Sequence, residues 1–129
     1  MDLLDRLAAE SDLRQLIAIY PQHADDGDAE GFASLFAPDG VIVIGDERIA
    51  GRAAIGQWLL GTIKKPTRHI MVNPYLVVDD AEHAHGSMDM ELLRKGDDGW
   101  RLRSTIRYAD SFVRTDEGWK FAQRELKLR

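Results

Sequence analysis

The sequence predicts an α+β fold in which N-terminal helices pack on a strongly curved antiparallel sheet. In the first third, apolar residues recur at helical spacing. The second half alternates apolar and polar residues in long segments separated by short turns. A hydrophobic content of 44% and a charged content of 30% over 129 residues are those of one folded unit. We therefore expect a single domain over residues 1–129.

Four helical segments are expected in the first half of the chain. A short helix covers residues 3–8, and a second one begins at the candidate cap Ser11 and ends at Gly27. Because proline lacks a backbone donor, Pro21 should interrupt the second helix and kink it just after Tyr20. The other two expected helices are Ala29–Phe36, capped by Asp28, and Gly51–Ile63.

The remaining segments are predicted to be strands. A short β-branched run, Val41–Ile44, lies between the turn signals Pro38–Gly40 and Gly45–Asp46. Longer strands are expected at residues 68–78, 84–94, 100–115 and 118–128. Since their separators are short and rich in glycine or acidic residues, these strands should pair as an antiparallel meander.

A strongly curved sheet that is closed on one side by helices encloses a cone-shaped internal pocket. Such a pocket suits a small apolar ligand. The opposite face of the sheet still has to be covered, and a second copy of the chain is the usual cover. We therefore expect a homodimer that forms through the outer sheet face.

Composition and charge exclude several classes of function. The chain has no cysteine, which rules out thiol nucleophiles, disulfides and zinc–thiolate sites. No apolar run is long enough to cross a membrane, and the first residues lack a secretory apolar region, so a cytoplasmic location is expected. A net charge of −5 argues against nucleic acid as a partner.

Cofactor and metal sites are not expected. The sequence contains neither a glycine-rich phosphate loop nor a nucleophile elbow. His83 and His85 share one face of a strand, but no further ligand accompanies them. The acidic segment Asp25–Asp28 lacks the remaining ligands of a calcium loop.

Three residues are candidates for acid–base chemistry: Asp25 near a helix end, His69 near the start of a strand, and Tyr20 on the core face. A carboxylate, an imidazole and a phenol are the groups that a metal-free acid–base site requires. Each also has a structural interpretation, which residue type alone favours. The carboxylate can be solvated, the imidazole can be a satisfied strand histidine, and the phenol can be a packing residue.

Five short segments, in their order and spacing, carry a resemblance to a known family. They are Tyr20 with Asp25–Asp28, Phe36–Gly40, Gly51–Arg52 with Ile55, Thr67–His69 with Asn73, and Gly118–Phe121. On these segments the chain resembles the SnoaL-like branch of the nuclear-transport-factor-two-like superfamily, which are cone-shaped α+β barrels. The likeness covers nearly the whole chain.

The resemblance implies roles for particular residues. The family includes scytalone dehydratase, lindane dehydrochlorinase, a bile-acid dehydratase and polyketide cyclases. Several of the eliminating members use an aspartate and a histidine that fall on Asp25 and His69, and the bile-acid dehydratase adds a tyrosine that falls on Tyr20. The residues expected to bind the substrate are Asn73, Tyr108, Met88, Trp58 and Phe36.

The chain also departs from the pattern of scytalone dehydratase. Met88 stands where that enzyme has a second histidine, and Tyr108 stands where it has a pocket asparagine. Scytalone is therefore not the expected substrate, and a more apolar pocket is expected.

The function that the resemblance implies is a dehydratase-like lyase without a cofactor. An Asp25–His69 dyad would remove a proton from a carbon beside a carbonyl group, and a leaving group would depart. The expected partner is a small apolar or hydroxylated carbonyl ligand. The alternatives are an isomerase or cyclase on the same dyad, and a non-catalytic ligand-binding or oxygenase small-subunit module. A gap between the two side chains far beyond ~3.2 Å would favour the non-catalytic alternative.

Overall fold

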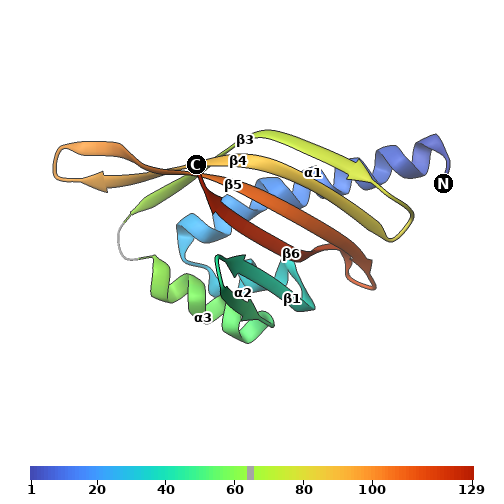
Figure 1. Ribbon diagram of the computed structural model, residues 1–129, viewed down its shortest axis with the longest axis horizontal. Coiled ribbons are helices and arrows are strands. Elements are labelled where there is room, and N and C mark those ends of the chain that lie inside the picture. Colours follow the sequence, from blue (N-terminus) through green and yellow to red (C-terminus); the bar gives the residue numbers. More distant parts are fainter. Residues whose placement is uncertain (64–65) are drawn as a thin grey trace.

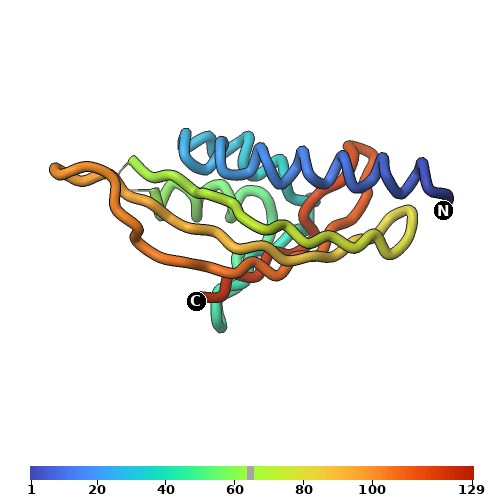
Figure 2. Tube along the Cα trace, turned by 90° about the horizontal axis from the view of Figure 1, so that it is seen from above, coloured from blue at the N-terminus to red at the C-terminus, as the bar shows by residue number. Residues whose placement is uncertain are grey.

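Three helices lie on one side of a curved six-stranded sheet, as the two perpendicular views show (Figure 1, Figure 2). The computed structural model describes residues 1–63 and 66–129. The helices are α1 (Leu3–Asp26), α2 (Ala29–Ser34) and α3 (Arg52–Thr62). The strands are β1 (Phe36–Ile44), β2 (Glu47–Ala50), β3 (Thr67–Val78), β4 (His83–Gly96), β5 (Gly99–Thr115) and β6 (Gly118–Leu128). The predicted α+β architecture is confirmed.

The N-terminal helix α1 is one continuous helix, so the prediction of two helices with a cap at Ser11 is wrong. Its cap is Asp2, whose side chain accepts the backbone N–H of Asp5 at 2.8 Å. The helix continues past Pro21 and ends at Gly27, which takes the left-handed conformation at φ 67°. Tyr20 and Ala24, on either side of the proline, are both buried in the core, so packing holds the helix on both sides of Pro21.

The segment Pro38–Gly40 does not form the predicted turn, because it lies inside β1. The pairing of β1 with β6 is irregular between Phe36 and Val41, and a bulge of this kind absorbs residues that would otherwise end a strand. As a result α2 ends at Ser34, two positions before the predicted end at Phe36.

The sheet is mixed, with the strand order β2-β1-β6-β5-β4-β3. The meander from β3 to β6 is antiparallel, as predicted, and the strand bounds agree with the expected ones to within a few residues. The pairing of β1 with β6 is parallel, which the sequence did not predict. Of the helices described, none combines the length and the apolar character that crossing a bilayer requires.

Irregular pairings also occur within the meander, and they decide which side chains face the helices. In β3 the register shifts between Val72 and Tyr75, and Asn73 has a positive φ of 54°. A second shift lies between Ser111 and Phe112 in the pairing of β5 with β6. Because side chains alternate between the two faces of a strand, each extra residue moves the following side chains to the other face.

Candidate active site

An apolar cavity of about 260 Å³ lies between the helices and the concave face of the sheet. Every helix, and every strand except β2, contributes to its wall. Most of the lining is apolar, and the polar members among the described residues are Tyr20, Thr62, His69 and Tyr108. A hollow of this kind, with a few convergent polar groups, is the usual form of a small-molecule site.

The structure brings Asp25 and His69 into direct contact at the wall of this cavity. Asp25 lies in the last turn of α1, and His69 lies near the start of β3. The carboxylate oxygen Oδ1 of Asp25 lies 2.6 Å from the ring nitrogen Nδ1 of His69. The same carboxylate accepts the backbone N–H of His69, at 3.0 Å to Oδ1 and 3.2 Å to Oδ2. Three contacts therefore fix the strand start to the helix end.

This geometry determines which nitrogen of His69 is free. Because an ionised carboxylate can only accept hydrogen bonds, Nδ1 is assigned as the protonated nitrogen and Nε2 as the acceptor. Nε2 has no hydrogen-bond partner among residues 1–63 and 66–129. The His69 ring lines the cavity, so Nε2 is the atom available to a ligand. The His69 side chain is mostly shielded from solvent, with 13% of its surface exposed.

Two phenols stand in the same wall. The rings of Tyr20 and Tyr108 meet edge to face with their centroids 5.9 Å apart. Burial raises the pKa of Tyr20 and raises that of Tyr108 well above its usual value, although the positive charge of Arg124 opposes both shifts. Both hydroxyl groups therefore stay protonated at neutral pH and can act as hydrogen-bond donors.

A family model described as a SnoaL-like domain matches residues 5–125. The chain belongs to the SnoaL-like domain family. The match covers nearly all of the helices and of the sheet, and it includes both members of the Asp25–His69 pair. No curated protein matches the chain at a significant level.

Solved structures share the fold of this SnoaL-like domain. A protein of unknown function from Mycobacterium tuberculosis is 23% identical, with a TM-score of 0.89 over 100% of this chain and 77% of that one. An NTF2-like protein with a cystatin-like fold from Novosphingobium aromaticivorans is 25% identical, with a TM-score of 0.88 over 97% and 84%. A candidate scytalone dehydratase from the same organism is 22% identical, with a TM-score of 0.84 over 97% and 87%.

The predicted substrate-binding residues of this SnoaL-like domain divide into two groups. Trp58 and Tyr108 line the cavity. Phe36 and Met88 do not line it, and both belong to the buried core. Asn73 does not line it either, because the bulge in β3 moves this residue to the exposed surface.

Sequence reasoning missed a buried ion pair behind the cavity wall. Arg124 of β6 donates to both carboxylate oxygens of Asp110 on β5, at 2.8 and 2.9 Å, and both side chains are fully buried. Although burial lowers the pKa of Arg124, the charge and hydrogen bonds of Asp110 hold it above the usual value. A signal was present: Arg124, Leu126 and Leu128 alternate in β6, which places the arginine on an apolar face.

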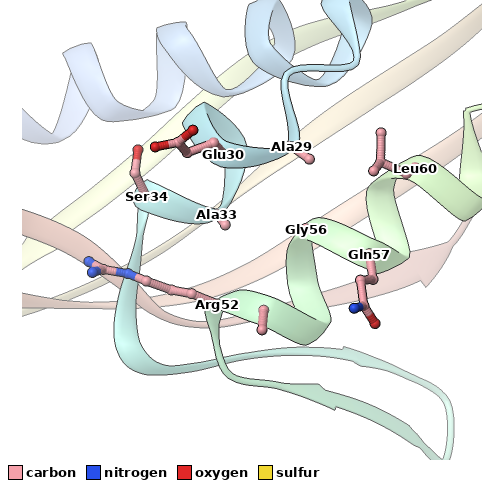
Figure 3. Close-up of a pocket in the computed structure, with 9 residues that line it drawn as sticks. Ala29, Glu30, Ala33, Ser34, Arg52, Gly56, Gln57 and Leu60 are labelled. Carbon is pink, nitrogen blue, oxygen red and sulfur yellow. The ribbon is translucent and has the colours of Figure 1, made fainter.

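A second hollow, formed by described residues of α2 and α3, contains no histidine. Figure 3 shows a groove between α2 and α3 whose floor includes Ala33 and Gly56. Arg52 at its edge is already engaged, since it donates to the backbone oxygen of Phe36 at 2.8 Å and to Glu117 at 3.0 Å. Within the described ranges, no group of three or more histidine or acidic side chains is arranged to hold a metal ion.

Proposed function

We propose that this SnoaL-like domain is a small-molecule lyase of the dehydratase type, with Asp25 and His69 as its acid–base dyad. The observation that supports the proposal is the 2.6 Å contact between Asp25 Oδ1 and His69 Nδ1, with the same imidazole in the cavity wall. A carboxylate on one ring nitrogen selects the tautomer and stabilises the imidazolium that forms during proton transfer. The other nitrogen is then the base.

The proposed reaction starts with a neutral substrate that carries a carbonyl group and a hydroxyl group on the β carbon, which is the second carbon away from the carbonyl carbon. Nε2 of His69 takes a proton from the carbon beside the carbonyl, and the electron pair of that C–H bond moves to the carbonyl oxygen. Tyr20 donates a hydrogen bond to this oxygen as its negative charge grows. The electrons then return to form a carbon–carbon double bond while the C–O bond breaks. The imidazolium proton goes to the departing oxygen, so water leaves and His69 is neutral again.

The cavity supports a small and mostly apolar substrate. Its volume of about 260 Å³ suits a ligand of one or two rings. The described part of its lining contains no lysine, arginine or carboxylate side chain. A permanently charged ligand would lose its hydration there without gaining a direct ion pair. The candidate scytalone dehydratase among the structural relatives is consistent with this class of chemistry, although at 22% identity it supports only the fold.

Deuterium exchange tests the first step before a leaving group is known. The protein would be incubated in D₂O with a panel of neutral cyclic ketones and hydroxyketones, and exchange at the carbon beside the carbonyl would be followed by NMR. We expect exchange with the wild type and its loss with His69→Ala. The same spectra would reveal water loss as an enone signal, or a moved double bond if the protein is an isomerase.

A second histidine provides a matched control. His85 also has its Nδ1 against a carboxylate, Asp79 Oδ2 at 2.9 Å, but its side chain is 55% exposed and does not line the cavity. His85→Ala should retain full exchange activity. Equal loss in both variants, or equal exchange in both, would contradict the assignment of His69 as the base.

A further inference from the structure

The ion pair behind the cavity is not explained by stability. Arg124 donates to Asp110 through Nε and Nη2, and Nη2 also lies 3.1 Å from the sulfur of Met88. Its third nitrogen, Nη1, is buried and has no hydrogen-bond partner in the described part of the chain. Apolar residues of similar volume often replace a buried ion pair with neutral or favourable effect on stability. A full charge at this depth therefore points to a further role.

The position of the guanidinium suggests that role. Its central carbon lies 3.6 Å from the ring centre of Tyr108 and 4.3 Å from that of Tyr20. These two rings separate it from the cavity, which both of them line. A cation against the face of an aromatic ring is held by the electrons of the ring. In a buried site, such a fixed positive charge favours negative charge on an atom that the phenols contact.

We propose that Tyr20 and Tyr108, with Arg124 stacked behind both rings, form a subsite for one oxygen atom of a neutral cyclic substrate that gains negative charge while bound. The compounds that fit are enolisable ring ketones and phenols, and carboxylates do not fit. This inference rests on the proposed function only in placing the substrate in this cavity. Arg124 touches no ligand and acts through the two phenols, so it is a positioning residue.

Ionisation of a bound phenol tests the subsite without any turnover. The probe is 4-nitrophenol, whose anion is yellow and which ionises near neutral pH, and its control is 4-nitroanisole, which has no proton to lose. We expect the wild type to bind the yellow anion in preference to the neutral phenol. If 4-nitrophenol binds only in its neutral form, at a pH where the free compound is ionised, the proposal is wrong.

A charge-free variant isolates the contribution of Arg124. Asp110→Val combined with Arg124→Met removes both charges at similar total volume. We expect the affinity for the nitrophenolate, relative to nitroanisole, to fall by about tenfold or more, since the variant removes a buried positive charge that acts on the anion through a low effective dielectric. Unchanged nitroanisole binding would show that the cavity is intact. If the double variant fails to fold, Tyr108→Phe keeps the ring and the ion pair, and the same loss of preference is expected.

His69→Ala separates this inference from the proposed lyase reaction. A protonated imidazole could also hold an anion, but the proposal requires the preference for nitrophenolate to survive in His69→Ala. If the preference disappears there and persists in the charge-free variant, His69 holds the oxygen and the subsite is refuted. Deuterium exchange does not enter this measurement. The exchange assay can therefore refute the dyad while the nitrophenolate preference supports the subsite. The opposite pair of results can be observed in the same way.

Discussion

Removing Asp110 alone should destabilise the domain far more than removing Asp110 and Arg124 together. Asp110→Val leaves the guanidinium of Arg124 buried, with no carboxylate to neutralise it. Breaking a buried ion pair in this way costs about 3–5 kcal/mol, whereas replacing both partners by apolar residues is often neutral. The double variant Asp110→Val with Arg124→Met should therefore recover most of the stability that the single variant loses.

The expected change in melting temperature follows from the chain length. For 129 residues, an unfolding entropy of about 2.1 cal/mol/K per residue gives about 0.27 kcal/mol/K for the domain. A loss of about 3–5 kcal/mol then lowers Tm by about 11–18 °C in the single variant. The double variant should lie within about 5 °C of the wild type.

Calorimetry and guanidinium denaturation, on the wild type, Asp110→Val, Arg124→Met and the double variant, measure this cycle. The coupling free energy between the two sites is read directly from the four values. A single-variant loss below about 1 kcal/mol would mean that water reaches Arg124, which would refute the burial argument. Additive losses in the double variant would show that packing, and not charge, determines the cost.

Three further predictions concern other parts of the domain. Asp25→Asn should lower turnover by about 10–100-fold, because the charge-assisted bond to the imidazolium is worth about 1.5–3 kcal/mol, and the exchange assay above measures it. Gly86→Ala should destabilise by about 1–3 kcal/mol in a thermal melt, because a Cβ would lie 2.2 Å from the backbone oxygen of Tyr75. The hydrogen bond from Arg52 lowers the pKa of Glu117, so its stabilising effect is complete above the unfolded pKa of about 4.3 and is lost as the pH falls through the lowered folded value. The Tm difference between wild type and Glu117→Gln should therefore vanish once the pH is low enough to protonate Glu117 in the folded state.

Each of these has a control. Gly61 lies in α3 with nothing within 4 Å of an added Cβ, so Gly61→Ala should stabilise by about 0.4–1 kcal/mol where Gly86→Ala destabilises. If Asp25→Asn retains wild-type exchange rates, the carboxylate is not part of the chemistry. A Tm difference for Glu117→Gln that grows on acidification would mean that the folded state does not lower the pKa of Glu117.

The candidate dyad could be predicted because each member sits where local signals are strong. Gly27 and the cap Asp28 mark the end of α1, which places Asp25 in its last turn. The alternating segment that contains His69 marks the start of β3. Residue type alone did not favour a functional interpretation of either residue. The family resemblance connected them, and the structure then placed the two side chains in contact.

Asn73 and Arg124 face away from the side on which strict alternation would place them, and irregular strand pairing is the cause in both cases. Strict alternation from His69 puts Asn73 on the cavity side, but the bulge in β3 turns that residue outward. Strict alternation from Phe121 puts Arg124 on the outer side, but the irregular pairing of β6 turns it inward. The alternation of side chains does not show where an extra residue enters a strand, although the residues that follow it keep the shifted alternation. Arg124 also lies between the polar residues Gln123 and Glu125, so residue type alone predicts an ordinary solvated charge.

The parallel pairing of β1 with β6 has a consequence for how the domain folds. Phe36, from the first strand, is in register with Phe121, from the last one, so β1 cannot join the meander until its final strand, β6, has been made. Contacts between such distant segments carry a large loop-closure entropy and slow the search for the native state. We expect the hollow that holds His69 to appear late, after the hairpins have formed.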